Sequence, residues 1–357
     1  MLAAKRSVQK QIKNMSTIKT IILILFTVTT YGQDVSEIER LFQDGDFEKV
    51  VEKGSHLLET NGNNLTTCHL VGRALTELKK FNEAKPLFEK TTVISAPGWM
   101  KSWSFGYLGI CNYTTGNLKE SKSNFKKAIK LNATKNSTKF AEKRLKLIQL
   151  AEYTKDWEVF ETENIKFHIQ PNHQIEDLKY YCSAREDAFK ENNTFFNASP
   201  YKKIDFYVWS DFEEGKKVLG EEIGFANPDL CIINSKVNQT KGHEITHILC
   251  DFGINPSKKN RLINEGVAVA FDLTNRNRLE LAKSINQDNL SIRDLMNEPF
   301  KFHENVIYPV GGALIEYLME KKDKELIKRL LKEQTYDVLL EAYGIEIIEE
   351  FDQKIKN

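Results

Sequence analysis

The feature that most constrains the fold of this chain is a repeat near its N-terminal end. Three segments of similar sequence each combine a turn with the start of a helix. They lie at residues 44–50, 79–84 and 115–121. Phe47 precedes Phe81 by 34 residues, and Phe81 precedes Leu118 by 37. A period of this length is typical of helical hairpins that bury their apolar faces on one another. The repeat therefore predicts stacked helical hairpins over residues 35–131.

Small and aromatic residues recur at matching positions of the second and third repeats. Gly72 and Gly109 fall where two helices would cross closely, and Phe88 and Phe125 fall in the following helices. This pattern resembles the tetratricopeptide (TPR) repeat over about 95 residues, without most of its usual prolines. The resemblance implies a concave groove for a peptide or protein partner. The alternative is a spacer that only packs against the next domain.

The pattern changes after the repeats from helices to strands. Residues 139–153 predict one more amphipathic helix, which places a domain boundary near Lys155. Beyond it, a predicted helix at residues 175–196 lies between two segments that alternate apolar and polar residues. The predicted strands are residues 165–169, 204–208 and 230–234. Helical patterns then continue to the end of the chain. A small sheet combined with helices predicts an α+β catalytic domain over residues 155–357, after a TPR-like helical domain over residues 33–154.

The first 32 residues predict a secretory signal peptide. They hold five of the 51 basic residues and none of the 50 acidic ones, followed by an apolar run from Ile21 to Val28. This run is shorter than the roughly 20 residues of a membrane-spanning helix. We therefore expect export to the periplasm or the cell exterior and no permanent membrane span. The alternative is an uncleaved N-terminal anchor. The remainder has four more acidic than basic residues, which gives no support for nucleic-acid binding.

The five cysteines predict neither a metal ribbon nor a disulfide framework, because they are widely separated along the chain. They are Cys68, Cys111, Cys182, Cys231 and Cys250.

Residues 243–247, His-Glu-Ile-Thr-His, form an H-E-x-x-H motif. On a helix, His243 and His247 lie one turn apart on one face, so both imidazoles can bind a single metal ion. Glu244 lies around the helix from them and does not bind the metal. It is placed to take a proton from the attacking water and to pass it to the leaving amine, as a general base does in metal-assisted hydrolysis.

Glu265 is the candidate third ligand, 18 residues after His247 in the stretch Asn264-Glu265-Gly266. A second helix that returns to the first would bring its carboxylate to the metal. Two histidines, one glutamate and an open position are the ligand set of a catalytic zinc site, in which zinc lowers the pKa of bound water to about 7.

The HEITH motif followed by Asn-Glu-Gly at this distance resembles the gluzincin zinc metallopeptidases, and most closely those with a peptidase MA-like, thermolysin-like catalytic domain. The resemblance covers residues 157–331 and is strongest at the motif. It implies that His243, His247 and Glu265 bind zinc and that Glu244 is the catalytic base. It also implies that an extended peptide substrate pairs with an edge strand, here expected at residues 230–234.

The resemblance leaves two supporting roles open. Thermolysin-like members have an aspartate four residues after the third ligand, where this chain has Val269, so the group that supports a zinc-binding histidine must differ. A tyrosine or histidine often stabilises the oxyanion. Tyr308 is the preferred candidate, with His303 second. Tyr308 has the alternative role of packing against the motif helix.

The predicted function is that of a zinc-dependent peptidase, with two alternatives. The chain could be an exported TPR-like binding protein with a degenerate, zinc-binding peptidase domain. The same zinc chemistry could also act on a non-peptide amide or ester. Aminopeptidases of this superfamily have a glutamate before the motif that captures the substrate's free amine, whereas residues 224–228 here have no acid. An endopeptidase is therefore favoured.

Overall fold

The computed structural model describes residues 34–60, 62, 64–286, 290–321 and 323–356. The predicted signal peptide at residues 1–32 lies outside these residues. The chain divides into two compact units, residues 1–107 and 108–357, and the division falls within helix α5 (Gly98–Thr114). Strands begin at Glu158, close to the predicted boundary near Lys155. In the described part of the chain, no helix is both long and apolar enough to cross a membrane.

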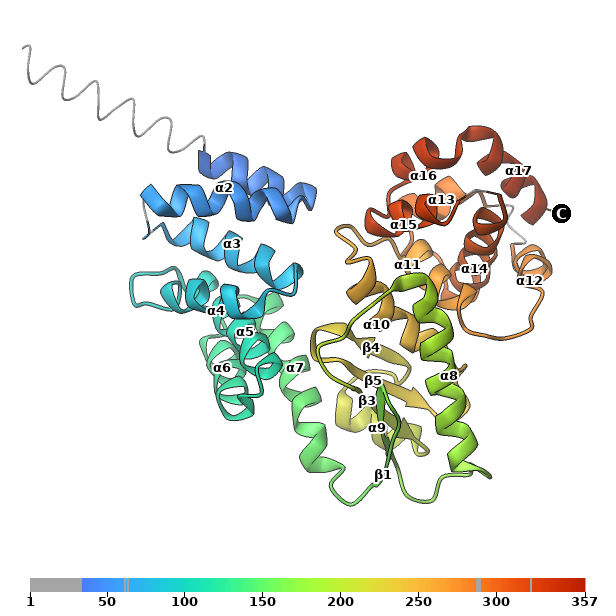
Figure 1. Ribbon diagram of the computed structural model, residues 1–357, viewed down its shortest axis with the longest axis horizontal. Helices are drawn as coiled ribbons and strands as arrows, with labels where there is room; N and C mark the ends of the chain where they lie inside the picture. Colours follow the sequence, from blue (N-terminus) through green and yellow to red (C-terminus); the bar gives the residue numbers. More distant parts are fainter. Residues whose placement is uncertain (1–33, 61, 63, 287–289, 322, 357) are drawn as a thin grey trace, which may run out of the picture. The chain divides into compact units, whose positions relative to one another are not determined.

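Consecutive helices joined by short turns make up the described part of the first unit (Figure 1). They are a helical segment at residues 34–44, α2 (Phe47–Thr60), α3 (Leu65–Glu77), α4 (Phe81–Lys90) and the first part of α5. Gly72 lets α3 pack closely on α4, because a Cβ atom there would lie 3.0 Å from the Phe88 ring. Gly109 and Phe125 make the equivalent contact in the second unit, where the distance would be 2.5 Å. The repeated residues therefore make repeated contacts.

The second unit contains a five-stranded mixed sheet within its described residues, with the order β1-β2-β3-β5-β4. The strands are β1 (Glu158–Glu161), β2 (Ile165–Ile169), β3 (Ile204–Trp209), β4 (Phe225–Asn227) and β5 (Ile232–Lys236). The pairs β2-β3 and β3-β5 are parallel, whereas β1 and β4 run antiparallel to their neighbours. With the surrounding helices, this sheet confirms the α+β class and the two strands predicted from alternation.

Helices surround the sheet and continue to the C-terminal end of the unit (Figure 1). Their bounds are α6 (Leu118–Leu131), α7 (Lys135–Tyr153), α8 (Leu178–Phe196), α9 (Phe212–Leu219), α10 (His243–Gly253), α11 (Arg261–Ala270), α12 (Arg278–Ile285), α13 (Ile292–Asn297), α14 (Glu304–Lys321), α15 (Lys324–Lys332), α16 (Tyr336–Tyr343) and α17 (Ile345–Ile355). Several begin at side-chain caps. Asp177 accepts a hydrogen bond from the Tyr180 amide at the start of α8, and Asn260 accepts one from the Leu262 amide at the start of α11.

Alternation along β3 separates the two faces of the sheet. Phe206 and Val208 belong to the main apolar core, which they share with Ile245 and Ile248 of α10. Trp209 points to the other face, where its ring centroid lies 6.3 Å from that of Tyr153 at the end of α7. Helix α10 therefore packs on one face of the sheet, and α7 contributes to the cover of the other.

The predicted edge strand at residues 230–234 is wrong in both its bounds and its position. A short 3-10 helix, Pro228–Leu230, and Cys231 at φ +50° reverse the chain, so β5 begins only at Ile232. Strand β5 lies between β3 and β4, and its first four residues are buried. A continuous apolar run suits such an interior strand better than an edge. The edge beside β5 is instead the short strand β4.

Helices α11 and α14 cross at two glycines. A Cβ atom on Gly266 would lie 2.6 Å from the Gly311 backbone, and one on Gly311 would lie 2.4 Å from the Leu262 carbonyl oxygen. Only glycine fits at such a distance. This contact fixes the position of α11, which carries Glu265, against α14, which carries Tyr308.

Candidate metal centre

His243 and His247 lie on the same face of α10, as the motif spacing predicts. Their ring centroids are 5.1 Å apart, and the ring planes are inclined at 83°. The residue before the helix is Gly242, where a Cβ atom would lie 2.2 Å from the Phe271 carbonyl oxygen. The start of α10 therefore packs directly against the residue that follows α11. This contact brings the two helices together at the end where His243 lies.

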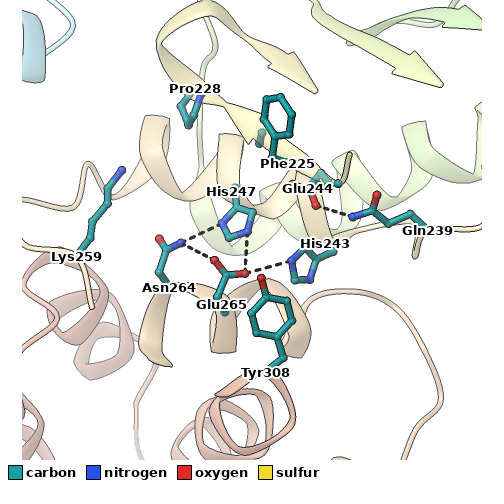
Figure 2. Close-up of a pocket in the computed structure, with 12 residues that line it drawn as sticks. Phe225, Pro228, Gln239, His243, Glu244, His247, Lys259, Asn264, Glu265 and Tyr308 are labelled. Atoms are coloured by element: carbon teal, nitrogen blue, oxygen red, sulfur yellow. Dashed lines mark hydrogen bonds and ion pairs between the residues drawn. The ribbon is translucent and has the colours of Figure 1, made fainter. Parts of the chain in front are cut away.

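Glu265 of α11 lies between the two imidazoles (Figure 2). Its Oε2 atom is 3.4 Å from Nε2 of His243 and 3.5 Å from Nε2 of His247. One potential ligand atom from each residue lies within 4.8 Å of the others, a set that the described residues contain only here. Two imidazole nitrogens and one carboxylate oxygen at this spacing fit the ligand set of a catalytic zinc ion, which keeps a further position open.

Electrostatics favour an ionised carboxylate at Glu265. Burial alone would raise the pKa of this group, because it penalises the charged form. Hydrogen bonds from His243 and His247 outweigh burial and hold the pKa of Glu265 well below its usual range. Glu265 is therefore ready to bind a cation without first losing a proton.

Glu244 is buried and lines the same cavity as the three candidate ligands, with its side chain hydrogen-bonded to Gln239 (Figure 2). Its Oε1 atom accepts a hydrogen bond of 2.5 Å from Nε2 of Gln239. Its Oε2 atom is also buried and has no hydrogen-bond partner among the described residues. Burial raises the pKa of Glu244 to about 7, against the lowering effect of His243. A carboxyl group with a pKa in this range can both take up and release a proton near neutral pH.

Tyr308 of α14 reaches the same site, whereas His303 does not line it. The Tyr308 ring is stacked on that of His243, with centroids 5.8 Å apart and planes inclined at 29°. Burial, followed by the negative charge of Glu265, raises the pKa of Tyr308, so its hydroxyl stays protonated. Tyr308 thus makes the packing contact with the motif helix, through His243, and also has a hydroxyl that can donate a hydrogen bond into the cavity.

Three residues of the site were not identified from the sequence. The Asn264 amide nitrogen lies 3.4 Å from Nδ1 of His247 and 3.5 Å from Oε1 of Glu265. Asn264 can therefore orient the candidate ligand His247. Val269, at the position where thermolysin-like members have the supporting aspartate, has no polar side-chain atom for this role. The place of Asn264 directly before Glu265 was the only signal in the sequence. The other two are Gln239 and Lys259, and Lys259 lines the cavity while forming an ion pair of 3.0 Å with Asp251.

A cavity of about 330 Å³ opens onto the candidate metal ligands. Residues of the edge strand β4 and the turn after it line one side, namely Phe225, Ala226 and Pro228. Glu244 and Glu265 are the acidic residues among the described residues that line it. The strand predicted to bind substrate, residues 230–234, does not contribute to the lining, and β4 takes its place.

Comparison with known proteins finds no family whose sequence pattern matches this chain and no matching curated protein.

Proposed function

We propose that this chain is a zinc-dependent peptidase of the gluzincin type, with a thermolysin-like, peptidase MA-like catalytic domain. The observation that carries the proposal is the convergence of His243, His247 and Glu265, from two helices, beside the buried carboxyl group of Glu244. Glu265 is kept ionised and Glu244 has a pKa of about 7, so the two glutamates suit different tasks.

His243, His247 and Glu265 would hold the zinc ion. When bound, zinc supplies a Lewis acid that activates water and polarises the carbonyl of the scissile bond. Oε2 of Glu244 takes the proton from the attacking water and returns it to the leaving amine. The Tyr308 hydroxyl donates a hydrogen bond to the oxygen on which negative charge develops.

The edge of β4 supports binding of an extended peptide. Ala226 pairs with Ile233 on one side of β4, and no other described strand pairs with the outer side. A substrate backbone can add there by main-chain hydrogen bonds, with its scissile bond over the cavity. The cavity has no acidic residue beyond Glu244 and Glu265 among the described residues that line it, which favours an endopeptidase over an aminopeptidase.

The remaining predictions belong to the same proposal. The chain is exported by a signal peptide at residues 1–32, and the TPR-like hairpins bind a protein partner or the substrate. There are two alternatives. The first is an exported binding protein that holds zinc without cleaving peptides. The second is a hydrolase that uses the same zinc site on non-peptide amides or esters.

The Glu244→Gln substitution tests the proposal. We expect wild-type protein to bind about one zinc ion and to cleave an unfolded protein substrate, because the three ligands and the base are present together. The variant keeps zinc but loses at least about 10²-fold in kcat, since an amide cannot accept the proton. Metal content by mass spectrometry and peptide release by chromatography measure both effects.

Glu191→Gln, an exposed change on α8, is the matched control and keeps full activity. Zinc binding without cleavage of any peptide, amide or ester in a broad panel by either protein would favour the binding-protein alternative. A folded wild-type protein without affinity for zinc would refute the metal site.

A further inference from the structure

Gln239 lies in the loop between β5 and α10 and contacts both elements through its side-chain amide. Its Oε1 atom accepts hydrogen bonds from the Lys236 backbone amide, at 3.3 Å, and from the Ser235 hydroxyl, at 3.2 Å. Its Nε2 atom donates to Oε1 of Glu244, at 2.5 Å. The amide therefore connects the end of a buried strand to the acidic residue of the motif.

These partners permit only one orientation of the amide. The backbone N–H of Lys236 can only donate, so it must face the side-chain oxygen of Gln239. An ionised Glu244 can only accept, so it must face the side-chain nitrogen. A rotation that exchanged the two atoms would break both contacts at once. Gln239 thus presents a fixed donor to Glu244.

The surrounding backbone holds the loop in place. The backbone N–H of Gln239 donates to the backbone carbonyl of Lys236 at 3.1 Å. Nη2 of Arg185 donates to the backbone carbonyl of Gln239 at 3.0 Å. Gly224, at φ +111°, leaves room for the side chain, because a Cβ atom there would lie 3.3 Å from both Nε2 and Oε1 of Gln239. The loop that carries the donor is therefore held by hydrogen bonds to residues other than Glu244.

The result is an unequal pair of carboxylate oxygens on Glu244. Oε1 is occupied by Gln239, whereas Oε2 is buried without a partner among the described residues. We infer that Gln239 is a positioning residue, which holds Oε1 so that Oε2 alone faces the attacking water. This inference rests on the proposed peptidase function and assigns the residue that orients its base.

Two isosteric substitutions separate this role from packing. Gln239→Met keeps the length of the side chain but removes the donor, and Gln239→Glu keeps the shape but places an acceptor opposite Glu244. We expect both to lower kcat about 10- to 100-fold, as loss of an orienting partner does, while KM changes by less than about twofold. Zinc content stays close to the wild-type value, because Gln239 contacts none of the three ligands. Tm falls in both variants, because the hydrogen bonds to Ser235, Lys236 and Glu244 are disrupted, so kcat is measured well below the Tm of each variant. Asn238→Ala, an exposed neighbour in the same loop, is the control and keeps wild-type kinetics.

A double variant tests whether Gln239 acts through Glu244. In the Glu244→Gln background, the second change Gln239→Met causes no further loss of the residual zinc-dependent rate, because the oriented base is already gone. An additional loss of the same size as in the wild type would overturn the inference. So would a wild-type kcat in Gln239→Met, or a loss confined to KM or to zinc content. If the wild-type protein itself cleaves no substrate, the proposed function fails first and the positioning role fails with it.

Discussion

Glu244 and Glu265 lie in one cavity, and their surroundings move their pKa values in opposite directions. Burial alone would raise the pKa of both groups. Two histidine donors reverse the effect of burial at Glu265, whereas at Glu244 the lowering effects of His243 and of the neutral donor Gln239 do not. The number and type of hydrogen-bond donors thus distinguish a candidate ligand from a candidate base.

The metal-free protein should lose stability between pH 4.5 and about pH 7 because of Glu244. In this window the group is protonated in the folded chain and ionised in the unfolded chain, since its pKa rises from 4.5 to about 7 on folding. The folded state therefore binds more protons, and its free energy of unfolding falls as the pH rises, by at most about 3 kcal/mol. Urea unfolding of chelator-treated protein at pH 5 and pH 8 measures the change. Glu244→Gln should remove this part of the pH dependence, and an equal pH dependence in both proteins would contradict the argument.

Among the contacts between elements, the close crossing of α11 and α14 at Gly266 and Gly311 determines how Glu265 and Tyr308 lie relative to each other. Gly311→Ala would place a methyl group 2.4 Å from the Leu262 carbonyl oxygen, and backbone cannot move aside as a flexible side chain can. We expect a destabilisation of about 1–3 kcal/mol and weaker zinc retention, because the forced separation moves Glu265 and Tyr308. Urea unfolding and metal content after dialysis measure the two effects. Gly62→Ala is the control, since its methyl would lie at an ordinary 3.5 Å from the Leu58 carbonyl oxygen. Equal stability of the two variants would show that the crossing can relax.

Periodicity predicted those elements whose apolar pattern is uninterrupted. Strands β2 and β3 and helix α10 follow directly from alternation or from the motif. The β4–β5 hairpin was missed, because it depends on a side-chain cap by Asn227 and a left-handed Cys231 rather than on hydrophobic spacing.

The candidate ligands and the candidate base lie in two short segments, residues 243–247 and 264–266. The residue types and their spacing within these segments were enough to predict them. Asn264 and Gln239 became visible only from contacts made in three dimensions, with His247 and Glu244 respectively. Neither residue type signals a role by itself, because exposed amides of this kind are common on protein surfaces.

At the scale of the whole molecule, α7 acts as part of the unit that holds the site. Arg144 pairs with Asp229 beside the β4–β5 turn, and the Tyr153 hydroxyl donates to Glu214 of α9. Trp209 is fully buried on this side of the sheet. Helix α7 therefore covers apolar surface that the strands cannot cover themselves.

A chain that begins at Lys155 tests how far the catalytic fold depends on this cover. Loss of α7 exposes the Trp209 face, so we expect the shortened chain to lose at least about 2 kcal/mol of stability and to aggregate. A chain that begins at Gly98 keeps α5 to α7 and serves as the control. Urea unfolding and light scattering compare the two. Equal stability would mean that residues 155–357 fold as an independent domain.

All five cysteines are buried thiols. Burial raises the pKa of Cys182 and of Cys250 to about 12, and the reactive thiolate is scarce at such values. An alkylating reagent can therefore label these side chains only while the surrounding fold is open. Cys68 lies in the first compact unit, and Cys111, Cys182, Cys231 and Cys250 lie in the second. The order in which these cysteines are alkylated over time, measured by mass spectrometry, therefore reports which of the two units unfolds locally first.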